Sequence, residues 1–375
     1  MIQLDDATQP LLHDLIKAPG GFAWWYLEVL DDARSGLVMI WSFGLPFLPG
    51  YMSLTRSGRQ ELPEDRPSLN VAVYEEGRLI YYVLHEFEPD DVTWDGAGHW
   101  RFGQTEITQR DEDGTRYVDV DLDCPVHAMG APLRGRVRVA GPIPKINGEP
   151  VEMGQQQHLW TPAAVPAFAT ALLDLSGTRR FSVAGHAYHD RNGSPHALDA
   201  LGIGTWVWGH ASVHGQERIF YILWPGDAEL GVGQCVGFEV DAQGNIEARK
   251  DLRVRMVRYR RTFYGMPTWD AVELITPDGE LWFRAALRDP VDDGPFYLRY
   301  ICDVAAQQGQ DRTTCVGSLE VIVPSRIDLA VHRPLVRMRV ATDTRKNSFW
   351  LPLFQGRLDD RFARMWGHIR AAGGQ

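Results

Sequence analysis

The chain has 375 residues, which is long enough for two domains. Its 44% hydrophobic and 23% charged residues are typical of a folded globular protein and exclude a disordered one. The formal net charge of -11 argues against nucleic acid as a partner and against simple electrostatic docking on anionic lipid.

Residues 1–17 carry three aspartates and no apolar run, so they predict neither a signal peptide nor a membrane span. A short helix is expected at Pro10–Lys17. The four cysteines form no CxxC pair, which indicates reduced thiols rather than a zinc site. We therefore expect a cytoplasmic protein, with a peripheral membrane contact for substrate delivery left open. The sequence gives no indication of oligomeric state.

Most of the chain follows the two-residue period of antiparallel strands. Aromatic and β-branched residues predict hairpins of Phe22–Leu30 with Gly36–Phe43 and of Leu69–Tyr74 with Leu79–His85. Residues 140–157 are rich in Pro, Gly and Gln and predict a long loop. The next strands are expected at Trp94–Trp100, Thr105–Gln109, Tyr117–Leu122, Gly135–Val139 and Ala164–Leu173.

The second half continues in the same way, with a hairpin of Gly204–Val213 and Arg218–Trp224. A C-terminal helix is predicted at Leu358–Ala371, and its apolar face is expected to cap a barrel rather than bind a partner. Such regular strand spacing predicts an all-β protein of two antiparallel barrel or sandwich domains, residues 1–200 and 201–375. The remaining strands are expected at Cys235–Val240, Leu252–Arg258, Trp269–Ile275, Leu281–Ala286, Phe296–Val304 and Cys315–Val323.

The segment FSVAGHAYHDRN, residues 181–192, contains the first candidate chemistry. On a strand, His186, Tyr188 and Asp190 share one face, and His189 and Arg191 share the other. A buried carboxyl group keeps its proton near neutral pH and could protonate an alkene. From spacing alone, Asp190 is explained more simply as a turn residue that pairs with Arg191 in solvent.

The segment QHLWTP places His158 and Trp160 on one strand face, where the indole ring could stabilise a cation. Spacing alone favours a histidine at a domain seam beside a core tryptophan. His186, His189, Asp190 and His196 invite a metal interpretation. His186 and His189 point to opposite strand faces, however, so we predict no metal site. The sequence has no G-x-S-x-G elbow, P-loop or dinucleotide-binding motif, and no cofactor is predicted.

Five stretches resemble the carotenoid 1,2-hydratase family, also called hydroxyneurosporene synthases. They are FAWWYLEVLDDARSGLVMIWSFGLPFLPGYMS, LNVAVY, HLWTP, GHAYHDRNG and GTWVWGHA, between about residues 20 and 215. The resemblance implies two packed lipocalin-like (calycin-type) β domains and cofactor-free addition of water to the terminal alkene of an isoprenoid.

Carried over by position, the resemblance implies that Asp190 is the acid and that Tyr188 and His189 orient or reprotonate it. It also implies that His158 and Trp160 line the cation site. The predicted substrate contacts are Trp160, His186, Trp206, Trp208, Trp25 and Tyr51. Two departures bear on this assignment, because Arg191 replaces the family's second histidine and Gly193 stands where the family has tryptophan. Arg191 must point away from Asp190 for alkene protonation to work.

The leading hypothesis is thus a hydro-lyase or cyclase that acts on a hydrophobic isoprenoid-like alkene by protonation and quenching of the cation. A pericyclase-like (Diels–Alderase-type) catalyst would need no acid and would only orient a polyene. A non-catalytic lipocalin-like carrier would return its hydrophobic ligand unchanged.

Overall fold

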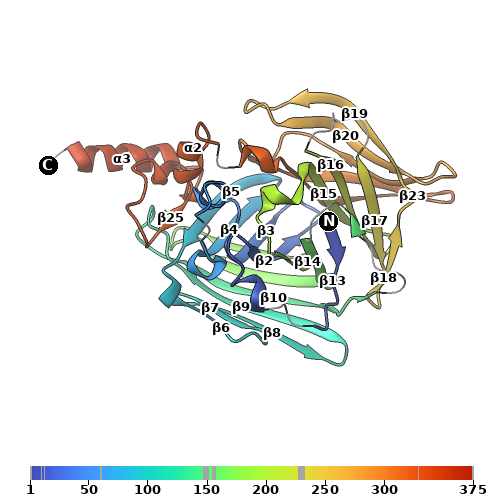
Figure 1. The fold of residues 1–375 in the computed structure, drawn as a ribbon, viewed down its shortest axis with the longest axis horizontal. Helices are drawn as coiled ribbons and strands as arrows, with labels where there is room; N and C mark the ends of the chain where they lie inside the picture. The colour runs from blue at the N-terminus through green and yellow to red at the C-terminus, as the bar shows by residue number, and fades with distance from the viewer. Residues whose placement is uncertain are drawn as a thin grey trace.

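A computed structural model describes residues 2–9, 11, 13–59, 61–146, 152–153, 158–226, 233–327 and 329–373. Strands dominate and form two large, curled, mainly antiparallel sheets packed against each other (Figure 1). The prediction of two packed antiparallel β units of lipocalin-like type is confirmed.

The first sheet has 15 strands, most of which follow one another along a continuous hydrogen-bonded path. Along this path they are β25 (Ala341–Thr342), β5 (Arg78–Glu86), β4 (Pro67–Glu75), β3 (Gly36–Phe43), β2 (Phe22–Leu30), β14 (Arg180–Ser194), β13 (His158–Asp174), β10 (Leu133–Pro142), β9 (Thr115–Cys124), β8 (Thr105–Glu112), β7 (His99–Phe102) and β6 (Val92–Trp94), with β1 (Ile2–Leu4), β12 (Glu152–Met153) and β26 (Gly356–Arg357) pairing at its sides.

The second sheet has 11 strands and is built mostly from the second half of the chain. Its order is β11 (Lys145–Ile146), β18 (Asn245–Arg249), β17 (Gln234–Val240), β16 (Gln216–Pro225), β15 (Ile203–Val213), β24 (Asp311–Ile322), β23 (Tyr297–Gln308), β21 (Leu281–Ala286), β20 (Pro267–Ile275) and β19 (Arg253–Arg261), with β22 (Asp292–Asp293) beside β23. The division at residue 200 stays a prediction. Strand β11 joins the second sheet, while β25 and β26 return to the first.

Helices are few and short among the described residues. The α-helices are α1 (Tyr51–Arg56), α2 (Arg333–Arg337) and α3 (Arg361–Gly373), and the 3-10 turns are η1 (His13–Leu15), η2 (Pro63–Asp65), η3 (Pro89–Asp91), η4 (Leu198–Leu201), η5 (Pro324–Arg326) and η6 (Leu351–Leu353). None of these helices has the length and apolarity needed to cross a bilayer.

Several element predictions need correction. The helix expected at Pro10–Lys17 is only the 3-10 turn His13–Leu15, and Pro10 lies outside the described residues. The strand expected at Trp94–Trp100 is interrupted by a turn, because the Asp95 carboxylate accepts three backbone N–H bonds there. The described part of the loop expected at residues 140–157 is largely strand, because it holds the end of β10 and the short strands β11 and β12, while 147–151 and 154–157 lie outside the described residues.

The C-terminal helix is confirmed as α3, but its apolar face does not cap a barrel. Met365 is buried, whereas Phe362 and Trp366 are each 64% exposed. Figure 1 shows α3 standing out from the body of the molecule.

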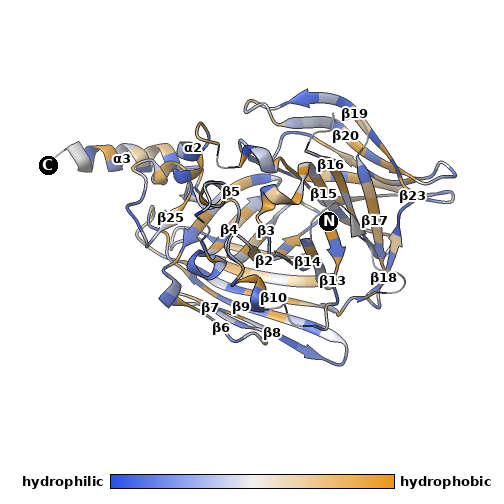
Figure 2. Ribbon diagram, viewed as in Figure 1, coloured by the Kyte–Doolittle hydropathy of each residue, from blue (hydrophilic) through white to orange (hydrophobic). Residues whose placement is uncertain are grey.

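Three apolar clusters lie in layers. One fills the curl of the first sheet and contains Trp25 and Trp41, and another fills the curl of the second sheet around Trp282. The third lies between the sheets and brings Trp24 and Tyr26 against the second sheet's residues. Successive residues of β2 therefore face different cores, because side chains alternate between the two faces of a strand. Figure 2 shows the hydrophobic strands at the centre of the molecule.

Candidate active site

Strands β13 and β14 change their surroundings along their length. In β14, residues 180–186 alternate between buried and exposed, whereas residues 187–194 are all buried. β13 shows the matching change, because residues 158–165 are buried and the rest alternate. One face of these strands packs in the core of the first sheet, and the other face is buried only where the second sheet covers it. This seam holds the motif GHAYHDRNG and the segment HLWTP.

Asp190 lies in this seam with 3% of its surface exposed. Its Oδ2 accepts hydrogen bonds from Trp160 Nε1 at 2.8 Å and from the Tyr188 hydroxyl at 2.7 Å. Its Oδ1 accepts one from Asn192 Nδ2 at 2.9 Å. Three donors thus point at one carboxyl group, and two of them lie within two residues of Asp190 on the same strand face.

Two opposing effects set the proton affinity of this carboxyl group. Burial raises the pKa of Asp190, while the hydrogen bonds from Tyr188 and Trp160 lower it, and the balance raises the pKa to about 7. Asp190 can therefore hold a proton near neutral pH. The same donors would stabilise the carboxylate that remains after the proton leaves.

Asn192 is held in place by a histidine. His158 Nε2 lies 2.9 Å from Asn192 Oδ1, and His158 is fully buried among aromatic rings. Burial lowers the pKa of His158 to about 4, so its ring is neutral at pH 7. Because the Asn192 amide donates to Asp190, its oxygen must accept from His158, which fixes the proton on Nε2. His158 is thus a positioning residue one step behind the acid.

Arg191 points to the opposite face of β14, as the hydratase interpretation requires. Its guanidinium lies 3.1 Å from a carboxylate oxygen of Asp5 and 3.1 Å from the backbone oxygen of Asp6. The arginine that replaces the family's histidine is therefore occupied by the N-terminal segment and does not pair with Asp190.

His189 also lies on that opposite face, inside the first sheet's core. Its Nδ1 lies 2.8 Å from the Tyr26 backbone oxygen, and its ring stacks on Trp41. Burial lowers the pKa of His189 to about 3. The structure does not bring His189 to Asp190, so the expected role in orienting or reprotonating the acid has no geometric support.

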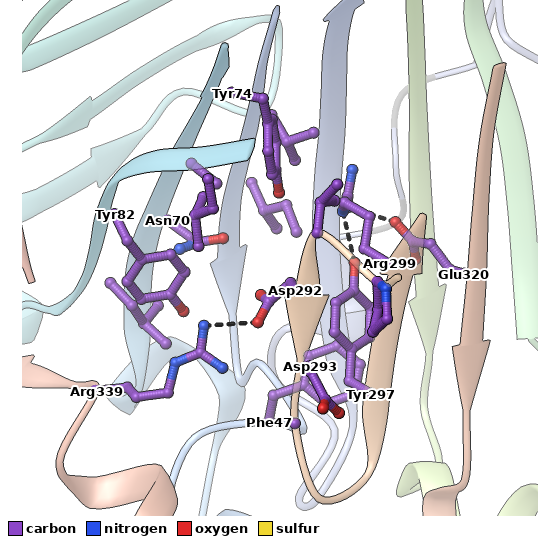
Figure 3. Close-up of a pocket in the computed structure, with 18 of the residues that line it drawn as sticks. Phe47, Asn70, Tyr74, Tyr82, Asp292, Asp293, Tyr297, Arg299, Glu320 and Arg339 are labelled. Carbon is purple, nitrogen blue, oxygen red and sulfur yellow. Dashed lines mark hydrogen bonds and ion pairs between the residues drawn. The ribbon is translucent and has the colours of Figure 1, made fainter. Parts of the chain in front are cut away.

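A cavity of about 1140 Å³ opens beside Asp190, between the two sheets. Its first wall is the outer face of β2, β3, β4, β5 and β14, and its second wall comes from β15, β16, β23 and β24. Aromatic side chains line it near the acid, including Trp24, Tyr26, Trp206, Trp208 and Tyr221. Figure 3 shows the part of this cavity around Asn70, Tyr74, Arg299 and Arg339.

The predicted site residues fall into three groups. Asp190, Trp206 and Trp208 line the cavity. Tyr188, His158 and Trp160 lie behind its wall and contact Asp190 or Asn192.

The other predicted substrate contacts lie elsewhere. Trp25 packs against Trp41 and Trp100 in the core of the first sheet. Tyr51 is buried, and its hydroxyl donates to the Gly21 backbone oxygen. His186 shares the face of Asp190 but is exposed, because the second sheet does not cover β14 at that point.

Asn192, Tyr221, Trp24 and Tyr26 line the cavity near the acid but were not predicted as site residues from the sequence. Asn192 could have been found, because it follows Asp190 by two positions and so shares its face. Tyr221 and Trp24 could not, since their inclusion depends on how the two sheets pack.

A buried ionic network lies beside the acid and joins the two sheets. Arg299 donates to the Tyr26 hydroxyl at 2.7 Å, lies 3.2 Å from Glu28 Oε2, and pairs with Glu320. His210 Nδ1 lies 2.6 Å from Glu217, and its ring stacks on Tyr188 at 4.4 Å. The partners of Arg299 thus include two protein carboxylates.

The charges within this network support each other. Burial alone would raise the pKa of Glu28, but the hydrogen bond and charge of His210, with Arg299 and Ser318, lower it to about 2. Burial would lower the pKa of His210, but Glu217 and Glu28 raise it to about 10. At neutral pH the pair is a carboxylate and an imidazolium.

One group of the described residues has the spacing of metal ligands. His85, His127 and Asp343 place their ligand atoms within 4.8 Å of one another. His85 Nε2 and Asp343 Oδ2 already share a hydrogen bond of 2.7 Å, and the group lies outside the cavity wall. It is not the set of histidines that the sequence offered.

Two relatives resemble this chain over most of its length. An acyclic carotenoid 1,2-hydratase of Thiocapsa roseopersicina is 27% identical over 322 residues, covering 81% of this chain and 69% of that protein. A protein of Chlorobaculum tepidum named hydroxyneurosporene dehydrogenase is 24% identical over 327 residues, covering 82% and 83%.

Two solved structures share the fold. A protein from Nitrosomonas europaea described as AttH aligns with a TM-score of 0.53 at 14% identity, over 84% of this chain and 97% of that one. CghA with Sch210972 aligns with a TM-score of 0.52 at 13% identity, over 81% and 89%.

The family model described as carotenoid hydratase CrtC matches residues 39–348, which include Asp190 and the cavity-wall strands β4, β5, β14, β15, β16, β23 and β24, but not β2. The predicted family and the predicted class of enzyme, a hydro-lyase, are thereby confirmed. This chain belongs to the carotenoid hydratase CrtC family.

Proposed function

We propose that this protein adds water to a trisubstituted alkene of an acyclic isoprenoid, without a redox cofactor, and that Asp190 is the proton donor. The observation that carries the proposal is the buried Asp190 carboxyl group, with a pKa of about 7, at the wall of an aromatic-lined cavity. Family membership supports hydration as the reaction type.

The proposed reaction balances in two steps. Asp190 transfers its proton to the less substituted alkene carbon, and a tertiary cation forms at the other carbon while the carboxylate remains. Trp160, Tyr188 and Asn192 donate to that carboxylate, so the charge that develops on it is stabilised. Water then attacks the cation and loses a proton to Asp190, which restores the acid.

The cavity wall suits the cationic intermediate. Trp206, Trp208 and Tyr26 present ring faces or edges to the space beside Asp190, and aromatic faces attract a cation. Tyr221 lies at the same wall, and no hydrogen bond among the described residues engages its hydroxyl. It could hold the attacking water.

Two other interpretations lead to different results in one assay. The protein is incubated in oxygen-18-labelled water with lycopene, an acyclic carotene, and in parallel with farnesol, an acyclic isoprenoid alcohol, and the products are analysed by mass spectrometry. Our proposal requires a product heavier by one labelled water, formed by the wild type and lost in Asp190→Asn. Rearrangement without added water, preserved in Asp190→Asn, would identify a pericyclase. Binding with unchanged recovery would identify a carrier, and either result would overturn hydration.

The cavity also favours contact with a membrane, where a carotene resides. Leu358, just before α3, and Phe362, in its first turn, line the cavity, and the exposed Trp366 lies one turn further along the helix. Phe349 and Trp350, beside η6, are 43% and 44% exposed. Residues 329–373 carry nine Arg and Lys against three Asp, although the whole chain is acidic. We propose that this end of the molecule rests on a lipid surface.

A further inference from the structure

The cavity has a second polar region that alkene hydration does not use. Its residues are Asn70 and Tyr74 of β4, Tyr82 of β5, and the Asp292–Arg339 ion pair across from them (Figure 3). Asn70, Ala72 and Tyr74 share one face of β4, and Tyr82 is the cross-strand partner of Ala72. These side chains therefore converge on one part of the cavity.

This region lies at a defined separation from the acid. Asp190 pairs with Tyr26, Tyr26 with Ile40, and Ile40 with Asn70, so the four residues form one row across neighbouring strands. Three strand spacings of about 4.8 Å place Asn70 about 14 Å from Asp190 along the wall. A single elongated ligand could touch both.

The Tyr74 hydroxyl is available to a ligand in this region. Tyr74 is 2% exposed and lines the cavity, and no hydrogen bond within the described part of the chain engages its hydroxyl. The hydroxyl can therefore donate to a ligand oxygen in place of water. Asn70 donates to the Val83 backbone oxygen at 2.7 Å, which leaves its own oxygen available as an acceptor.

The charges of the region indicate what kind of ligand group it accepts. Arg339 lies 2.9 Å from Asp292 Oδ1 and stacks over the Tyr82 ring at 4.6 Å. Arg299, further along the cavity, pairs with Glu28 and Glu320. Because both guanidinium groups are neutralised by carboxylates, an anionic group such as a carboxylate or diphosphate gains little here. A neutral oxygen suits the donor at Tyr74 and the acceptor at Asn70.

We propose that the substrate is an oxygenated isoprenoid, and that Tyr74 and Asn70 bind a neutral hydroxyl or carbonyl group about 14 Å from the alkene carbon that Asp190 protonates. This inference rests on the proposed function only in taking Asp190 as the reacting end. It makes Tyr74 a residue that determines specificity, because a site built to bind a hydroxyl discriminates against the hydrocarbon that lacks it.

The test measures binding and needs no turnover. Quenching of intrinsic tryptophan fluorescence gives the Kd of three probes, namely farnesol, the hydrocarbon farnesene and farnesyl diphosphate. In Tyr74→Phe we expect the Kd of farnesol to rise about three- to tenfold, the effect of one neutral hydrogen bond, while that of farnesene stays unchanged. Asn70→Leu should act in the same direction.

The matched control is Tyr81→Phe. The Tyr81 hydroxyl bonds to Ser176 inside the first sheet, away from the cavity, so this variant should leave both affinities unchanged. Unchanged farnesene binding also shows that Tyr74→Phe is folded. Farnesol binding that survives in Tyr74→Phe, equal weakening of both probes, or tighter binding of the diphosphate than the alcohol would overturn the inference. None of these results depends on hydration, which the labelled-water assay tests separately.

Discussion

The indole N–H of Trp160 lies 2.8 Å from Oδ2 of Asp190 and shares that oxygen with the Tyr188 hydroxyl. Trp160 is fully buried, and its ring packs on Tyr221 and Phe238 of the second sheet. One side chain therefore supports the acid and also binds the two sheets together. The donor holds the carboxyl in place and favours its ionised form.

Trp160→Phe separates these two roles, since it removes the donor and keeps most of the aromatic packing. We expect turnover to fall about 10- to 100-fold, because a hydrogen bond to a charged group contributes about 1.5–3 kcal/mol. Loss of the donor should also move the pKa of Asp190 upward, which the pH–rate profile measures. Tyr188→Phe should show the same two effects. A slower enzyme with an unmoved profile would mean that packing alone was damaged.

The wild-type pH profile follows from the pKa of Asp190, which burial raises to about 7. The protonated form is the active one, so the rate should be constant below about pH 6 and fall about tenfold per pH unit above about pH 8. Initial rates between about pH 5 and 9, with binding of substrate measured separately, check this. A rate that rises with pH through this range would contradict an acid role for Asp190.

Arg191 provides a control for the assignment of the acid, because it adjoins Asp190 in sequence but not in space. Its partners are Asp5 and the Asp6 backbone oxygen. Arg191→Gln should lower the free energy of unfolding by about 2 kcal/mol, since it removes a largely buried charged hydrogen bond. The pH–rate profile should not change. Urea unfolding and the pH–rate profile measure the two effects, and a profile shifted by Arg191→Gln would show that the arginine reaches the acid.

Much of the fold followed from the sequence, because alternation of apolar residues marks strands directly. β2 and β3 begin and end at the predicted residues, and Tyr188 and Asp190 share a face as expected. The resemblance to the hydratase family then identified the acid, which spacing alone had explained as a turn residue.

The wrongly predicted substrate contacts depend on which face of the first sheet packs against the second sheet, and the sequence does not show this. Trp25 was expected to bind substrate, but Trp24 lines the cavity, because a step of one residue reverses the face. His186 is on the correct face but beyond the seam. Arg299 and Glu28 are 271 residues apart, and no local pattern links them.

The ionic network should make stability depend on pH. Glu217 and Glu28 raise the pKa of His210 from 6.5 to about 10, so its stabilising effect is fully present below pH 6.5 and is lost as pH rises toward 10. The groups that face it are Glu217, Glu28 and the Tyr188 ring, with Glu320 nearby.

We expect the unfolding free energy of the wild type to fall between about pH 7 and 9.5 by a few kcal/mol more than that of His210→Gln. Urea unfolding of both proteins at both pH values measures how much more the unfolding free energy of the wild type changes than that of the variant. Because tyrosines and lysines titrate in both proteins, the comparison with the variant isolates His210. Equal pH dependence in the two proteins would mean that His210 is neutral in the folded state.

The exposed aromatic residues of α3 predict how the protein meets lipid. Phe362 and Trp366 lie four residues apart, and therefore on one face of the helix, beside Arg361 and Arg370. Insertion of the two rings at the headgroup boundary would place the start of α3, and with it the cavity, at the membrane surface. Since the chain as a whole is acidic, the rings rather than net charge should supply most of the affinity.

Phe362→Ser combined with Trp366→Ser should therefore reduce co-flotation with phosphatidylcholine vesicles that contain phosphatidylglycerol about tenfold or more, since two large apolar side chains are lost. The double variant should unfold at the same urea concentration as the wild type, because both side chains are exposed. Its rate with carotene in vesicles should fall more than its rate with detergent-solubilised carotene, since Phe362 also lines the cavity. The matched control is Tyr259→Ser, an aromatic residue of similar exposure on β19.

Vesicle binding unaffected by the double variant would place the membrane contact elsewhere. Self-association lost in the double variant would instead mark the α3 face as an interface between two copies of the chain.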